Sequence, residues 1–200
     1  MNLARLLQLA SPTLPVGAYS YSQGLEAAVE AGIVHDAESA EQWIGDVFEF
    51  SVTPMDGAIV PALMQGEDLN DFYLASRETA ELRAETLQMG YSLCRLLQEL
   101  GVDNVPQGEV AFPTAFACAA KAWGIEPGEA VQAYLWSWLE NQVMAAIKAV
   151  PLGQTAGQRM LLSLGEKIVL ESENKLCNFA PGLAMLSTQH ETQYSRLFRS

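Results

Sequence analysis

The sequence predicts an all-α fold, arranged as one domain of about eight to ten helices over residues 1–200. Apolar residues recur at three- and four-residue spacing along most of the chain, which is the period of one helix face. Glycine and proline fall between these stretches, where helices end or begin. No run of alternating apolar and polar residues indicates a strand, and 50% of the chain is hydrophobic, which is enough for one core.

The start of the chain contains two expected helices with a loop between them. Residues 2–10 (NLARLLQLA) carry leucines on one helix face, and a loop rich in proline, glycine and hydroxyl groups follows at 11–23. Ser20 and Gln23 have the spacing of a capping box, in which each side chain satisfies a free backbone N–H. A second helix should therefore start there and stop at Gly32, a residue type common just past a helix end.

Prolines and glycines divide the rest of the chain into further helices. Asp36 should cap a helix, and Pro54 should start another that Pro61 kinks or breaks. Residues 68–100 read as one long helix that Gly101 ends. Three more helices are expected over residues 113–124, 127–150 and 153–173.

The charge distribution is uneven as well as acidic. The net charge is −13, and residues 6–76 hold eleven acids and no lysine or arginine. Such a stretch repels phosphate backbones, so nucleic acid is not an expected partner. Two interpretations stay open: a solvated acidic face, or a surface that attracts a basic protein or metal ions.

Composition also places the chain in a compartment. No apolar run is long enough to cross a membrane, and the first residues are too amphipathic for a secretory signal. Three cysteines at wide spacing indicate buried side chains in a cytoplasmic protein. Only 18% of the residues are charged, which favours burial of surface against partners.

Enzyme and cofactor motifs are absent or incomplete. The segment HETQY (190–194) lacks the second histidine of a helical zinc site, and GQTAGQRM (153–160) lacks the Lys-Ser/Thr pair of a phosphate loop. Two histidines and three scattered cysteines make poor ligand sets for a metal. The sequence therefore predicts no cofactor, no resident metal and no catalytic residue.

Three groups of polar residues stand out from their surroundings. Lys148 is the only charge between Glu140 and Arg159, so it either snorkels to water at a helix end or meets a carboxylate. Glu81 and Arg83 belong to a polar helix surface that by itself indicates solvation. The ending HETQYSRLFRS mixes aromatic, leucine and arginine side chains, which is typical of binding hot spots. We expect this tail, residues 188–200, to dock on a partner and not on its own domain.

Four blocks together carry a resemblance to a known family. They are SPTLPVGAYSYSQGLE (11–26), SRETAELR (76–83), NQVMAAIKAVPLGQTAGQR (141–159) and HETQYSRLFRS (190–200). Taken in this order, they resemble the UreF family of urease accessory proteins. The resemblance implies an all-helical homodimer that binds a UreD/UreH-type accessory protein and the GTPase UreG. Its implied role is non-catalytic: it regulates the GTPase so that nickel reaches apo-urease.

The resemblance also implies partner-binding residues. Glu26, Lys148 and Gln154 correspond to surface residues that contact the GTPase, with Glu81 and Arg83 as further candidates. Glu26 should be exposed on its helix, with Tyr19 of the opening loop beside it. The tail should lie against the UreD/UreH-type partner through four residues: Tyr194, Arg196, Leu197 and Phe198.

Two other interpretations remain possible at this point. The chain could be a small helical enzyme that uses Glu26, Lys148 or His190 in acid–base chemistry. It could also carry nickel directly, although its ligand set is poor.

Overall fold

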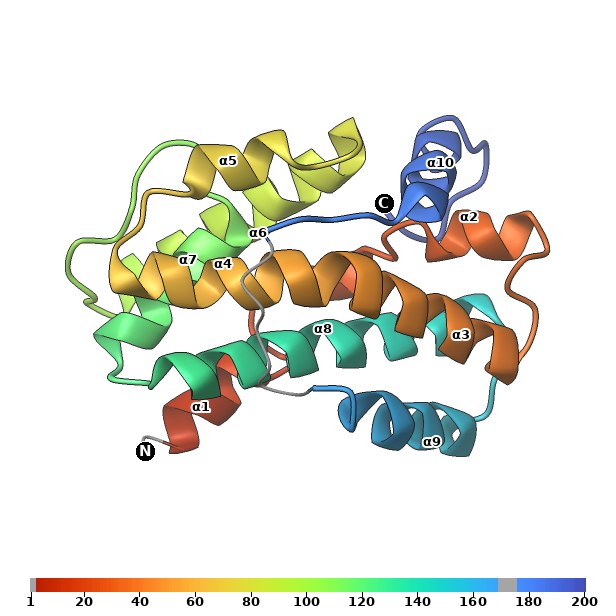
Figure 1. Cartoon of the computed structure of the whole chain (residues 1–200), viewed down its shortest axis with the longest axis horizontal. Helices are drawn as coiled ribbons and strands as arrows, with labels where there is room; N and C mark the ends of the chain where they lie inside the picture. Colours follow the sequence, from red (N-terminus) through yellow and green to blue (C-terminus); the bar gives the residue numbers. More distant parts are fainter. Residues whose placement is uncertain (1–2, 169–175) are drawn as a thin grey trace.

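The computed structural model describes residues 3–168 and 176–200, and these residues form an all-α fold, as predicted (Figure 1). The two irregular elements are a 3₁₀ turn (η1, Ala18–Ser20) and a π-helical turn (η2, Phe48–Val52). The ten α-helices of the described ranges are α1 (Leu3–Ala10), α2 (Leu25–Glu30), α3 (Ala37–Val47), α4 (Thr53–Gln65), α5 (Asn70–Ala75), α6 (Ala80–Glu99), α7 (Phe112–Ala122), α8 (Pro127–Ala149), α9 (Gln154–Gly165) and α10 (Pro181–His190).

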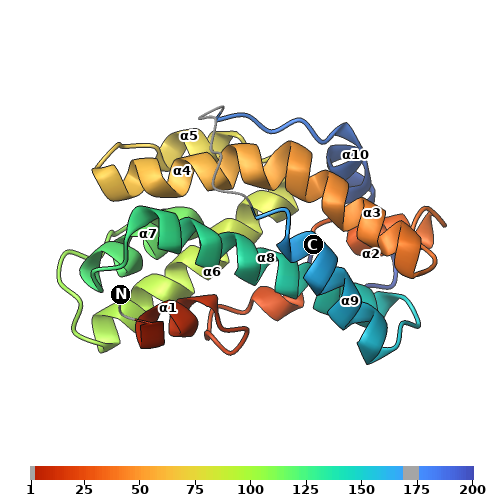
Figure 2. The same ribbon diagram turned by 60° about the horizontal axis from the view of Figure 1, so that its bottom comes forward.

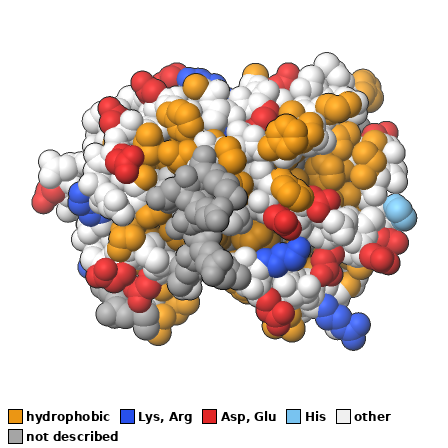
Figure 3. Space-filling model, in the orientation of Figure 1, with side chains coloured by type: hydrophobic (Ala, Val, Ile, Leu, Met, Phe, Trp, Pro, Cys, Tyr) orange, Lys and Arg blue, Asp and Glu red, His pale blue; other side chains and the backbone are white. Residues whose placement is uncertain are grey.

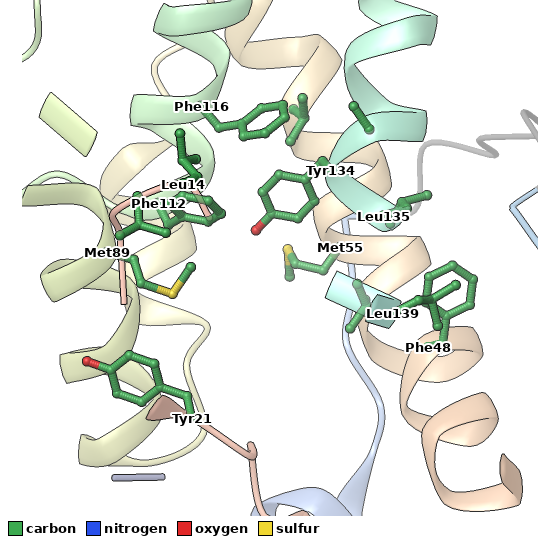
Figure 4. Packing of buried hydrophobic residues seen from close by; sticks show 14 of the residues in the cluster. Leu14, Tyr21, Phe48, Met55, Met89, Phe112, Phe116, Tyr134, Leu135 and Leu139 are labelled. Atoms are coloured by element: carbon green, nitrogen blue, oxygen red, sulfur yellow. The ribbon is translucent and has the colours of Figure 1, made fainter. Parts of the chain in front are cut away.

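Helix α8 lies at the centre of the bundle. It packs against α4, α9 and α1, while α7 lies between α4 and α6 (Figure 2). Phe116 of α7 is fully buried and meets Tyr134 of α8 edge to face, at 5.1 Å between ring centroids. Figure 4 shows these rings with Phe112 between the helices and Met55 close below them. The core therefore rests on aromatic packing, the largest apolar area that single side chains can bury.

The opening loop is part of this core. Leu14, Val16 and Tyr21 are each less than a tenth exposed, so the loop is anchored along its length. The predicted capping box of Ser20 and Gln23 is wrong. Helix α2 begins at Leu25, after two residues with positive φ, and the Gln23 side chain points inward instead.

Asp36 caps α3 as predicted, but the helix does not stop at Pro54. Ser39 and Asp36 form a capping box, and the π-helical turn then joins α3 directly to α4. Pro54 sits in the first turn of α4 and Pro61 does not break that helix. The continuous run Ala37–Gln65 is long and apolar enough to cross a membrane, but 61% of its most apolar window is buried in the bundle.

The long helix predicted over 68–100 is two helices, α5 and α6. Thr79 has extended backbone angles, and its hydroxyl accepts a hydrogen bond from the Leu82 N–H at 3.2 Å, so α6 begins anew there. The helices predicted at 113–124 and 127–150 match α7 and α8. Of the helix predicted over 153–173, α9 ends at Gly165, and residues 169–173 lie outside the described residues.

Candidate functional site

The tail returns across the opening loop and is bonded to it. The Arg199 N–H donates to the Ser20 carbonyl at 2.8 Å, and the Ser22 N–H donates to the Ser200 carbonyl at 2.7 Å. The Ser22 hydroxyl also donates to that carbonyl, at 2.6 Å. In Figure 1 the C-terminus accordingly lies next to α10 and α2. We call this region the loop–tail junction: residues 20–26 together with Glu81, His190 and residues 196–200.

Glu26 binds the main chain of the tail. Its Oε1 accepts the Leu197 N–H at 2.6 Å, and its Oε2 accepts the Phe198 N–H at 2.9 Å. Only 12% of its side chain is exposed. The prediction of an exposed Glu26 is therefore wrong. Two adjacent N–H groups need acceptors, and the Glu26 carboxylate in the first turn of α2 supplies a charged one for both.

His190, at the end of α10, lies between two carboxylates. Its ring is fully buried, with Nδ1 at 2.7 Å from Glu81 Oε2 and Nε2 at 3.2 Å from Glu26 Oε2. The other oxygen of Glu81 pairs with the guanidinium of Arg196. The junction thus joins α2, α6, α10 and the tail through charged hydrogen bonds.

Glu85, one helical turn after Glu81, connects the junction to an internal cavity. It is buried and accepts hydrogen bonds from Gln23 Nε2 at 2.7 Å and from the Ser200 hydroxyl at 2.8 Å. Burial raises the pKa of the Glu85 carboxyl to about 7. Gln23 in turn accepts the Trp138 indole N–H at 2.8 Å. These bonds connect the opening loop, the tail, α6 and α8.

The cavity has a volume of about 170 Å³ and a polar inner end. Asp56 Oδ1 accepts the hydroxyls of Tyr73 and Tyr134, each at 2.7 Å. Burial raises the pKa of the Asp56 carboxyl and of both phenols, while the nearby Arg77 guanidinium opposes the shift of Asp56. Arg77 stacks on the Tyr73 ring at 4.2 Å.

Tyr19 and Lys148 line the cavity, and Phe198 of the tail lies close to Lys148. Lys148 Nζ lies 5.9 Å from the centre of the Tyr19 ring and 5.8 Å from that of Phe198. Tyr19 comes from η1, Lys148 from the last turn of α8 and Phe198 from the tail. Lys148 is exposed, as predicted, and Tyr19 is 67% exposed. We call this group the Tyr19–Lys148–Phe198 surface.

Comparison with known proteins decides the family. The family model UreF matches residues 34–165. The chain belongs to the UreF family of urease accessory proteins. It is 53% identical over 224 aligned residues to a protein of Dechloromonas aromatica, covering all of this chain and 98% of that one. It is 54% identical over 225 residues to a protein of an Azoarcus species, covering 96% of that protein. Both relatives are named urease accessory protein UreF.

The remaining predicted residues of this UreF-family chain come from α9, α6 and the tail. Gln154 begins α9 and is exposed. Arg83 is partly exposed and pairs with Glu109 at 2.8 Å, not with a residue of the junction. Tyr194 and Leu197 project into solvent, with Tyr194 fully exposed.

The prediction that the tail docks on a partner and not on its own domain is wrong for part of the tail. Phe198 is 6% exposed and Ser200 is 1% exposed, so both pack on the domain. Glu81 was predicted as a surface residue, but its side chain is 15% exposed and faces His190. The charged groups of the tail and helices satisfy each other, which composition alone could not show.

The sequence did not identify Glu85, Gln23 and Asp56 as residues of the junction and the cavity. Glu85 lies three residues after Leu82 and four before Met89, which are both buried on the same face of α6. That spacing is the signal that could have identified a buried carboxylate.

The structure does not join the three residues of the enzymatic interpretation. Glu26 and His190 meet, but Lys148 contacts the aromatic rings instead. Within residues 3–168 and 176–200, no three His, Cys, Asp or Glu side chains are grouped to hold a metal.

Proposed function

We propose that this chain is a non-catalytic scaffold for urease maturation in the cytoplasm. In this proposal it bridges a UreD/UreH-type protein to the GTPase UreG, regulates that GTPase and so helps nickel enter apo-urease. Membership of a family of urease accessory proteins supports this role.

The single observation that carries the proposal is the Tyr19–Lys148–Phe198 surface. Lys148 and Phe198, which the family resemblance assigns to partners, come from separate parts of the chain and lie close to each other and to Tyr19 of the opening loop. A cation close to two aromatic rings is typical of a binding hot spot. Lys148 also stands out on a chain of net charge −13, so it offers a basic contact to an acidic partner residue.

The outer side of the tail fits the second partner in this proposal. Tyr194 and Leu197 point outward, and Arg196 is exposed although its guanidinium pairs with Glu81, while Phe198 and Ser200 fix the segment to the domain. Exposed aromatic and leucine side chains on a firmly bonded segment lose little entropy on binding. We assign this ridge to the UreD/UreH-type protein.

The proposal includes a homodimer. Phe50, Phe179 and Met185 are each at least half exposed. Figure 3 shows apolar side chains gathered over α10 and the adjoining ends of α2 and α3. Apolar patches of this kind favour association. Light scattering of the purified chain should give twice the monomer mass, and Met185→Asp should lower it.

A pull-down with purified UreG and the UreD/UreH-type protein, with and without GTP, tests the central role. Lys148→Ala should reduce capture of UreG at least tenfold. Lys121→Ala is the matched control, because Lys121 is also an exposed lysine in the last turn of a helix. Equal capture by both variants would contradict the proposal, as would turnover of a substrate by the chain without partners.

A further inference from the structure

We propose that the cavity beside Asp56 is a binding site for a small neutral molecule with one ring and one hydroxyl group, a monocyclic phenol. The scaffold role gives no function to the buried residues of this cavity. Its polar inner end is formed by Asp56, Tyr73 and Tyr134, each no more than 5% exposed. Tyr19 and Lys148 also line it and are exposed. The cavity therefore extends from the surface to the core of the bundle.

The size of the cavity sets the size of the ligand. Its volume is about 170 Å³. A cavity of roughly 150 Å³ in an apolar core holds one benzene molecule. One six-membered ring with a hydroxyl group therefore fits, whereas a nucleotide does not.

The wall beside the polar end suits such a ring. Leu14, Met89 and Phe112 line the cavity and are each less than a tenth exposed. Figure 4 shows these three side chains on one side of Tyr134, whose hydroxyl is turned away from Phe116 and towards the side where Met89 lies. Methionine sulfur and aromatic rings both make favourable contacts with a further ring.

Asp56 offers a free acceptor for the hydroxyl group. Its Oδ1 accepts the hydroxyls of Tyr73 and Tyr134, but no hydrogen bond from another described residue reaches Oδ2. Unlike Thr53 Oγ1 and Gln142 Nε2, this oxygen is not fully enclosed by protein atoms, so it is open to the cavity that Asp56 lines. A buried acceptor without a donor is costly, and a ligand hydroxyl supplies the donor.

The charges around the cavity favour a neutral head group. Asp56 and Glu85 both line the cavity and repel an anion, while Arg77 lines it as well and repels a cation. Burial raises the pKa of the Asp56 and Glu85 carboxyls. A hydroxyl suits both forms of such a group, because it donates to a carboxylate and accepts from a carboxylic acid.

The test titrates phenol into the free chain at neutral pH and follows the methyl signals by NMR. Binding should be saturable with a Kd of about 1 mM or below, which is ordinary for a ligand of this size. Nuclear Overhauser contacts should join the phenol ring to the methyl groups of Leu14 and Met89. Benzene should bind at least about fivefold more weakly, because it removes water from Asp56 Oδ2 without supplying a donor. Benzoate and benzylammonium, which carry charge, should bind at least about tenfold more weakly than phenol.

Ser137→Leu should block the site from α8. Ser137 lines the cavity and is partly buried, and its hydroxyl donates to the Tyr134 carbonyl of the preceding turn. The larger side chain should weaken phenol binding at least about tenfold. Ser92→Leu on α6 is the matched control, because Ser92 is also a partly buried helix serine, with its hydroxyl bonded to the Gln88 carbonyl. Ser92 lies outside the lining of the cavity, so the Kd of this variant should stay within about twofold of the unaltered chain.

Four results would overturn the inference. They are no saturation at about 10 mM phenol, ring contacts with exposed side chains only, benzene bound as tightly as phenol, and equal phenol binding by the two leucine variants. If Ser137→Leu does not fold, the ring contacts and the benzene comparison in the unaltered chain decide. The experiment contains no partner protein, so its failure leaves the proposed function standing, and a failed UreG pull-down leaves this site standing.

Discussion

The aromatic core and the loop–tail junction are held together in opposite ways. Between α4, α7 and α8 the contacts are rings and aliphatic side chains, with Phe116 fully buried against Tyr134. At the junction the contacts are carboxylates bonded to main-chain N–H groups, an imidazole and a guanidinium. The contacts of these apolar groups depend on burial, although Tyr134 also donates its hydroxyl to the buried Asp56 of α4. The contacts at the junction depend on which groups carry protons, so a change of pH should alter the junction more than the apolar packing.

The largest change in the free energy of unfolding is expected for a substitution in the core. Phe116→Ala removes a fully buried ring and leaves a cavity beside Phe112 and Tyr134, so unfolding should become easier by about 3–5 kcal/mol. Denaturant titration measures this loss, which should be the same at pH 6 and pH 8. Phe72→Ala, at a half-exposed ring on α5, is the control and should cost far less. A loss below about 1 kcal/mol for Phe116→Ala would contradict the packing described.

A smaller loss of folding stability is expected when Glu26 is replaced. Glu26→Ala leaves two tail N–H groups and His190 without their acceptor, which should cost about 2–3 kcal/mol. Denaturant titration again measures this loss. Glu30→Ala, on the exposed side of α2, is the control, and its free energy of unfolding should stay within about 0.5 kcal/mol of that of the unaltered chain. If the two variants unfold at the same denaturant concentration, Glu26 does not hold the tail.

Glu85 should give the junction a pH dependence. Its carboxyl has a pKa of 4.5 when unperturbed and about 7 when folded, so between these values the folded chain holds the extra proton. Stability should therefore fall as pH rises through this window, by on the order of 2 kcal/mol, with the full cost present above pH 7. Glu85→Gln, titrated at several pH values, should flatten this slope. An unchanged slope would show that Glu85 is ionised throughout.

The smallest effect is expected at Arg83. Its pair with Glu109 is exposed, so Arg83→Ala should change the free energy of unfolding by less than about 1 kcal/mol. The family resemblance makes Arg83 a candidate contact for the GTPase. A variant of normal stability that still binds UreG normally would remove it from that surface.

The helices were predictable where a local signal decides them. Asp36 with Ser39 caps α3, and Pro127 begins α8, because capping and first-turn preferences act within a few residues. The break between α5 and α6 was missed, since it depends on Thr79 bonding to Ser187 from α10 as well as to its own helix. The π-helical turn before Pro54 likewise has no short-range sequence signal.

Candidate site residues could be named from the sequence, but their geometry could not. Motif order pointed to Tyr19, Lys148 and the tail, and these lie together. The burial of Glu26 could not be predicted, because its partners lie more than 160 residues away in sequence. A carboxylate on a short helix is normally solvated, and only the returning tail makes this one structural.

The central claim is that the tail is already closed on the domain before any partner binds. Nuclear Overhauser contacts between the Phe198 ring and the Lys148 side chain measure this directly in the free protein at about pH 6. The account predicts that they are present, since Lys148 Nζ lies 5.8 Å from the centre of that ring. Contacts that are absent in the free chain and appear only after a UreD/UreH-type protein is added would contradict it.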